Sequence, residues 1–210
     1  MHVGPVHRCV VALLGGITRR HWGFAAHLMP PLVEQLGPVR ALSWFAWNLP
    51  RYQRTLARFG PVRTHLLATA ISLLNDCEYG SQGHGYALQL AYLRDHGELF
   101  PLDQHQLGEL CGRPPALVRH RLLDAAQRAG LHSDAPWLDR AIELATTPDP
   151  RPVERNELRV AHLVRMFSLL NAAATADNTA LDEAHDPVNK DSALKCRYHA
   201  MRSAANTTKG

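Results

Sequence analysis

Residues 61–77 read PVRTHLLATAISLLNDC, and this stretch decides the fold class. Pro61 has the fixed φ that suits a first helical turn, and Leu66, Ala70, Leu73 and Cys77 recur at the spacing of one helix face. The spacing predicts a helix from residue 61 to about residue 76. A sustained alternation of apolar and polar residues, the pattern of a half-buried strand, is missing from the sequence. We therefore predict an all-α protein.

Helical spacing continues on both sides of this stretch, and prolines and glycines mark the ends of the elements. We expect a break in the sequence Asn48-Leu49-Pro50, because a proline inside a helix removes a backbone donor and clashes with the preceding turn. Residues 168–171 repeat the Ser-Leu-Leu-Asn sequence of residues 72–75, which either a duplicated helical unit or chance would produce. The expected helices cover residues 30–37, 38–48, 50–59, 61–76, 80–95, 104–111, 114–130, 135–145, 153–176 and 192–204.

The domain organisation follows from length and from one proline-rich segment. A chain of 210 residues favours a single core. Residues 146–152 contain three prolines and form the clearest linker in the chain. We predict a helical domain over residues 1–145, this linker, and C-terminal helices over residues 153–210 that pack on the same core.

Composition describes an ordinary globular protein with a basic end. Hydrophobic residues make up 46% of the chain and charged residues 20%, which excludes disordered and disulfide-dense classes. The first 60 residues hold seven arginines and one acidic residue, Glu34, whereas the rest holds 16 basic and 18 acidic residues. This basic end would suit an acidic partner or nucleic acid, and a solvated helix face would have the same composition.

The sequence also indicates the cellular compartment in which we expect the protein. The apolar run at residues 9–16 ends in Thr18-Arg19-Arg20 with no cleavage site, so we do not expect a signal peptide, and no apolar run has the length of a membrane span. The four cysteines are too far apart in sequence to indicate a disulfide framework or a thiolate zinc site. We expect a cytoplasmic protein with no membrane contact, no metal and no other cofactor.

The residues that could carry chemistry lie in the stretch 71–84, ISLLNDCEYGSQGH. It resembles the redox motif of the alkylhydroperoxidase AhpD and carboxymuconolactone decarboxylase family, where a Leu-Leu-Asn-like run precedes two cysteines three residues apart and then a histidine. Cys77 and His84 match the first cysteine and the histidine, Gly80 replaces the second cysteine, and His65 replaces a relay glutamate. The resemblance covers about residues 50–105. It implies an AhpD-like helical bundle that assembles as a homo-oligomer.

The missing second cysteine changes the expected reaction. The peroxidase cycle of that family needs a peroxidatic thiolate and a resolving thiol that can form a disulfide, and one thiol cannot complete it. The resemblance therefore implies a divergent oxidoreductase or decarboxylase relative that acts on a small organic substrate by a thiol- or histidine-dependent mechanism. It does not imply a disulfide peroxidase.

Spacing leads to a specific hypothesis about the site. On a continuous helix, Cys77 and His84 would share a face but lie roughly 10 Å apart along the axis, too far for a hydrogen bond. We predict a small pocket over Gly80 lined by Cys77, Ser81 and His84, with His65 or Glu78 as the proton partner. The alternative is that the cysteine is packed as a small hydrophobe beside an interhelical histidine.

Two other readings of the sequence stay open. Residues 103–131 resemble a helix-turn-helix, with Arg119, His120 and Arg121 placed to face DNA, and a non-catalytic helical assembly protein would have the same periodicity. The sequence Asp182-Glu183-Ala184-His185 matches a helicase DEAH box, but a phosphate-binding loop is missing, so we interpret it as an acidic helix end.

Overall fold

The computed structural model describes residues 4–147 and 151–207, and within these residues the chain forms ten α-helices and two 3-10 helices with no strand. The all-α prediction is confirmed. The α-helices are α1 Pro5–Trp22, α2 Met29–Leu36, α3 Pro38–Phe59, α4 Pro61–Leu74, α5 Glu78–His96, α6 Gln104–Gly108, α7 Pro115–Arg128, α8 Ala135–Thr146, α9 Arg155–Ala176 and α10 Ser192–Thr207. The 3-10 helices are η1 His132–Asp134 and η2 Pro187–Lys190.

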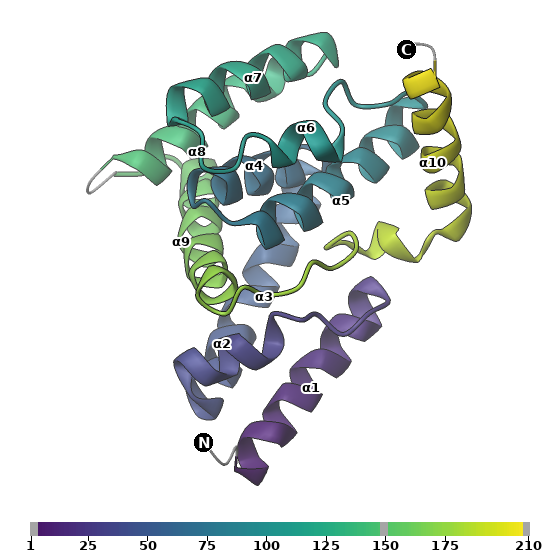
Figure 1. The fold of residues 1–210 in the computed structure, drawn as a ribbon. Helices are drawn as coiled ribbons and strands as arrows, with labels where there is room; N and C mark the ends of the chain where they lie inside the picture. Colours follow the sequence, from purple (N-terminus) through teal and green to yellow (C-terminus); the bar gives the residue numbers. More distant parts are fainter. Residues whose placement is uncertain (1–3, 148–150, 208–210) are drawn as a thin grey trace.

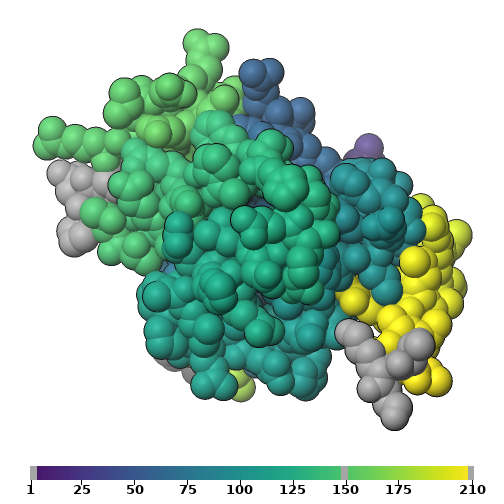
Figure 2. Space-filling view, turned by 90° about the horizontal axis from the view of Figure 1, so that it is seen from above, coloured from purple at the N-terminus to yellow at the C-terminus, as the bar shows by residue number. Residues whose placement is uncertain are grey.

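The hairpin of α4 and α5 lies in the middle of the molecule (Figure 1). Both helices are buried along most of their length, as expected for helices surrounded by others. Figure 1 shows α7 and α8 on one side of the hairpin, α1 and α2 on the other, and α10 beyond the far end of α5. Seen from above, the chain around α6 and α7 covers one face and α10 lies at its edge (Figure 2).

A tight turn joins α4 to α5. The N–H of Cys77 donates to the carbonyl of Ser72 over 3.0 Å, and Asp76 adopts a left-handed φ of 49°. His65 precedes Asn75 by ten residues and His84 follows it by nine, so the antiparallel hairpin places the two histidines at the same level. The turn therefore determines which residues of the two helices meet.

The repeated Ser-Leu-Leu-Asn segments meet each other across α4 and α9. The Asn171 amide donates to the Ser72 hydroxyl over 3.2 Å, and the Asn75 amide donates to the Ser168 hydroxyl over 3.5 Å. Each serine of one segment thus pairs with the asparagine of the other, as two copies related by a local twofold axis would do. Duplication of a helical unit remains a hypothesis that this arrangement favours.

The predicted break at residues 48–50 is wrong, because α3 continues through Pro50 from Pro38 to Phe59. Ala41, Tyr52 and Thr55 are buried along one side of α3, and a break would remove one end of this side from the core. Burial of a continuous face outweighs the single backbone hydrogen bond that a proline removes.

The remaining boundaries differ from the sequence prediction in smaller ways. The helix expected at 104–111 is only the five-residue α6, which begins with a capping box formed by Asp103 and Gln106. α1 was not among the predicted helices. Of the predicted linker, residues 148–150 lie outside the described residues. None of the described helices has both the length and the apolar character needed to cross a bilayer.

Candidate functional site

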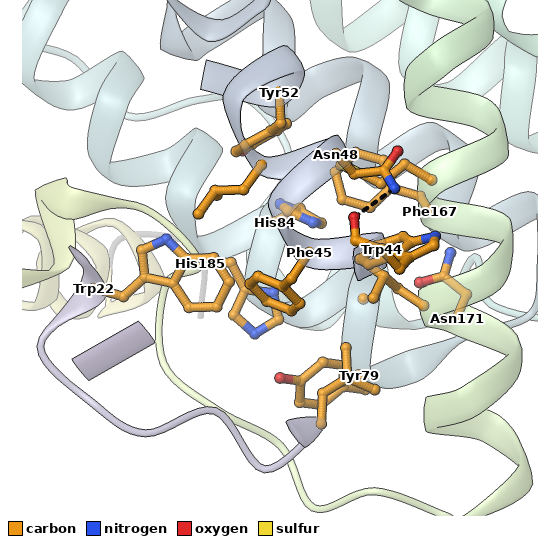
Figure 3. Close-up of a pocket in the computed structure, with 15 residues that line it drawn as sticks. Trp22, Trp44, Phe45, Asn48, Tyr52, Tyr79, His84, Phe167, Asn171 and His185 are labelled. Atoms are coloured by element: carbon orange, nitrogen blue, oxygen red, sulfur yellow. Dashed lines mark hydrogen bonds between the residues drawn. The ribbon is translucent and has the colours of Figure 1, made fainter. Parts of the chain in front are cut away.

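A mainly apolar pocket of about 60 Å³ lies where α1, α3, α5, α9 and the segment before η2 meet. Figure 3 shows its aromatic and histidine side chains pointing toward one another from these different parts of the chain. The lining residues are Trp22, Leu28, Trp44, Phe45, Asn48, Leu49, Tyr52, Tyr79, Gly80, His84, Met166, Phe167, Leu170, Asn171 and His185. A cavity smaller than the roughly 150 Å³ that holds benzene admits a ligand of only a few heavy atoms.

A chain of hydrogen bonds leads from this pocket into the core. Asp186 Oδ2 lies 2.9 Å from His65 Nε2, and His65 Nδ1 lies 3.3 Å from His84 Nδ1. All three residues are buried, and His65 is fully enclosed. His84 also lines the pocket, so it is the end of the chain that a bound molecule would touch.

The protonation states along this chain follow from its charges. Burial raises the pKa of the Asp186 carboxyl, but the hydrogen bond and charge of His65 and the N–H of Val188 outweigh it, so the pKa is below its ordinary value. The ionised carboxylate accepts a hydrogen bond from His65 Nε2–H. In the tautomer in which His84 donates its Nδ1–H to His65 Nδ1, His84 Nε2 has a free lone pair.

Burial keeps the pocket histidines neutral at pH 7. Burial lowers the pKa of His84 well below its usual value, and the neighbouring His185 and His65 lower it further. Burial lowers the pKa of His185 to about 3, with a further contribution from His65. The rings of His84 and His185 are 5.1 Å apart and nearly perpendicular. The pocket thus presents two neutral imidazoles to a ligand.

Two buried polar atoms of the pocket have no hydrogen-bond partner within the described part of the chain. They are the Tyr52 hydroxyl oxygen and His185 Nε2. Burial raises the pKa of Tyr52, and the charge of Asp186 raises it further, so the hydroxyl stays protonated and can donate. An unpaired buried polar atom costs about 1–3 kcal/mol, and a ligand that bonds to it would recover that cost.

The His185 ring is held in place by aromatic neighbours and by a glycine. It stacks on Trp22 with ring centroids 5.3 Å apart and lies 4.8 Å from Tyr79. A Cβ on Gly83 would lie only 2.2 Å from the ring, so a side chain at position 83 would displace it. Gly80 has a similar role, since its Cβ would meet Asn171 at 2.4 Å and Ser72 at 2.6 Å. The glycines of the motif therefore allow close packing around the pocket.

The structure separates the predicted site residues into two groups. His65 and His84 contact each other at the pocket. Cys77 and Glu78 line a different, more polar cleft together with Cys111, and Ser81 donates to the carbonyl of Glu78 over 3.0 Å. Cys77 is buried at the start of α5, where its sulfur accepts from Gly80 N–H over 3.4 Å. Tyr79 is the residue that lines both cavities.

The local chemistry of Cys77 does not activate its thiol. Burial raises the pKa of this thiol, and the hydrogen bonds from Gly80, Thr175 and Tyr79 only partly oppose this effect. Its side chain packs with the cluster formed by α1, α2 and the end of α9. At neutral pH the sulfur is therefore in the thiol form.

Sequence reasoning missed Tyr52, His185 and Asp186. The interpretation of residues 182–185 as a helix end is wrong, because they form a loop between α9 and η2. In this loop the Asp182 carboxylate accepts a hydrogen bond from the Tyr79 hydroxyl over 2.6 Å, and Tyr79 lines the pocket. One sequence signal could have identified His185 and Asp186: they lie in a segment without apolar periodicity, which indicates a loop. Loops often carry functional acids and histidines.

The helix-turn-helix alternative gains no support from the geometry. Arg119 of α7 forms an ion pair with Asp139 at 2.8 Å, and the first helix of the pair has only five residues. Among the residues that the structure describes, no three His, Cys, Asp or Glu side chains are arranged to hold a metal ion.

No protein-family model, curated protein or solved structure matches this chain.

Proposed function

We propose that the protein is an enzyme that moves a proton on a small carbonyl compound, with His84 as the base. The observation that carries this proposal is the chain of hydrogen bonds from Asp186 through His65 to His84, which ends at a small apolar pocket. The family resemblance implies a thiol-dependent or a histidine-dependent mechanism for a divergent carboxymuconolactone decarboxylase-like enzyme, and this proposal keeps the histidine-dependent one. A cytoplasmic location and homo-oligomeric assembly, which the resemblance implies, belong to the same proposal.

The chain of residues supplies a path for the proton. His84 Nε2 takes a proton from the carbon next to the carbonyl, and its Nδ1 proton passes to His65 Nδ1. His84 is then neutral again in its other tautomer, and the positive charge lies on His65 next to the Asp186 carboxylate. This route avoids leaving a cation on the His84 imidazole, because burial lowers its pKa well below the usual value.

In the same reaction Tyr52 would act as a hydrogen-bond donor, whereas His84 acts as the base. Its hydroxyl is buried, protonated and without a hydrogen-bond partner among the described residues, and it lines the pocket. When the substrate loses its proton, negative charge develops on the carbonyl oxygen, and a hydrogen-bond donor in an apolar site stabilises that charge. We assign this role to Tyr52.

The test is deuterium uptake next to the carbonyl of acetone, hydroxyacetone and pyruvate in D₂O, followed by proton NMR. The reaction needs only proton abstraction, so it does not depend on knowing the natural substrate. We expect the protein to accelerate exchange in at least one compound, and His84→Gln to lower the rate by about 10²–10⁴-fold.

Cys77→Ser is the matched control, because it changes the neighbouring cavity and leaves the histidine chain intact. It should retain the exchange rate of the unmodified protein. A rate lost in Cys77→Ser and kept in His84→Gln would instead assign the chemistry to the thiol. Absence of exchange in all three compounds would contradict the proposed reaction.

A further inference from the structure

A second cavity, a cleft of about 530 Å³, lies between α3 and α9 and is lined by arginines. Arg51 and Arg54 belong to α3, and Arg155, Arg159 and Arg165 belong to α9. Carboxylates are missing from the described residues that line the cleft. Its volume is in the range of small-molecule sites.

These five arginines surround one cleft without a carboxylate among its described lining residues to neutralise them. Within residues 4–147 and 151–207, none of the five forms an ion pair with a carboxylate, whereas five arginines on other helices do. These pairs are Arg63 with Asp134, Arg94 with Asp95, Arg119 with Asp139, Arg128 with Asp124, and Arg140 with Glu143 and Glu157. Like charges around one cleft repel each other, and a bound anion removes that repulsion.

A histidine in the cleft shows the effect of this charge. His162 lies between the arginines, its Nε2 is bonded to Asn48, and its buried Nδ1 has no hydrogen-bond partner among the described residues. Burial lowers the pKa of His162, and the charges of Arg51 and Arg165 lower it further. The cleft is therefore strongly positive.

An aromatic surface lies beside the positive charge. The Trp47 side chain is 67% exposed, and the guanidinium carbon of Arg51 lies 3.5 Å from the centre of its ring. One face of the indole is thus covered by Arg51, and the exposure of the ring leaves surface for another flat group. An arginine cluster next to an open tryptophan provides contacts for phosphates and for a base.

We propose that this cleft binds a nucleotide, with its phosphates on the arginines and its base on Trp47. The arginines come from two helices and converge on one cleft of small-molecule volume, which favours a nucleotide over a long nucleic acid. The proposal concerns binding alone and is independent of the pocket chemistry proposed above.

The test is isothermal titration calorimetry with ATP and with pyrophosphate at about 50 mM salt, where screening is weak. Arg54 and Arg165 are exposed, so the double variant Arg54→Gln, Arg165→Gln should keep the fold. We expect it to raise the Kd for ATP about 100-fold, because each charge-assisted contact contributes about tenfold. Arg121→Gln, an exposed arginine of α7, is the matched control and should leave the Kd unchanged.

Trp47→Ala separates the two parts of the proposal. It should raise the Kd for ATP about tenfold and leave pyrophosphate binding unchanged, since only ATP has a base to stack. The proposal is overturned by no measurable ATP binding, by equal effects of the Arg54/Arg165 and Arg121 variants, or by an ATP affinity that does not depend on Trp47. A 20-nucleotide single strand that binds much more tightly than ATP would also overturn it and assign the cleft to nucleic acid.

Discussion

Gly83→Ala tests whether the His185 ring is held where the pocket needs it. The added Cβ would lie 2.2 Å from Cε1 and 2.4 Å from both ring nitrogens, and ordinary contact begins at 3.4 Å. The ring would have to move by about 1.2 Å, away from its stacked position on Trp22. The backbone N–H of His185 is bonded to the carbonyl of Gly83 at 3.1 Å, which restricts this movement.

The expected magnitude comes from two opposed effects. Alanine improves helix propensity by about 0.5–1 kcal/mol, and overpacking a close-packed site costs about 1–3 kcal/mol. We therefore expect Gly83→Ala to lower the free energy of unfolding by about 1–2 kcal/mol, measured by urea denaturation. Gly16→Ala in α1 is the control with the opposite sign, because its Cβ meets nothing within 4 Å and should stabilise by about 0.5–1 kcal/mol. A Gly83→Ala protein as stable as the Gly16→Ala protein would refute the packing of His185 described above.

Three further predictions concern charge and reactivity. Burial lowers the pKa of His185 to about 3 in the folded protein, whereas the pKa in the unfolded chain is about 6.5. The free energy of unfolding should therefore be highest above pH 6.5 and fall by about 1.4 kcal/mol per pH unit as pH decreases toward 3. His185→Phe should remove this pH dependence, as measured by urea unfolding at several pH values. The Cys77 thiol is buried with a raised pKa, so a thiol reagent at pH 8 should label exposed Cys9 quickly and Cys77 only slowly, and fast labelling of Cys77 in mass spectrometry would contradict its burial. Asp186→Asn removes the negative charge that would stabilise protonated His65 during the reaction, so it should slow proton exchange about 10–100-fold. Asp191→Asn, which changes a nearby carboxylate at the start of α10, is the control and should leave the exchange rate unchanged.

The helical hairpin at the centre of the fold was predictable because its signals are local. Pro61 begins α4, the apolar residues recur at helical spacing, and the turn before Cys77 follows from the Asn-Asp sequence. Pro50 is the counterexample, because its local preference for a helix end is overridden by the buried face of α3. That face is defined by contacts with α4 and α9, which no window of sequence contains.

The candidate site was predictable only where it lies on the hairpin. His65 and His84 were identified from the motif, and their contact follows from the turn between them. Asp186 is 121 residues from His65 and belongs to a loop, so neither periodicity nor spacing relates the two. Tyr52 and His185 look like ordinary core and loop residues until the aromatic contacts around them are known.

The unpaired polar atoms of the pocket favour a ligand-binding role for the pocket over a role in packing alone. A pocket selected only for packing gains nothing from the hydroxyl of Tyr52 or the Nε2 of His185, because phenylalanine would fill similar space without an unpaired atom. At about 1–3 kcal/mol each, these two atoms cost a large part of the 5–15 kcal/mol by which a domain is usually stable. The adjacent His65 shows the contrast, since both of its ring nitrogens have partners although it is equally buried. The unpaired atoms of Tyr52 and His185 both line the pocket, and a small carbonyl compound is the kind of ligand that would pair with them.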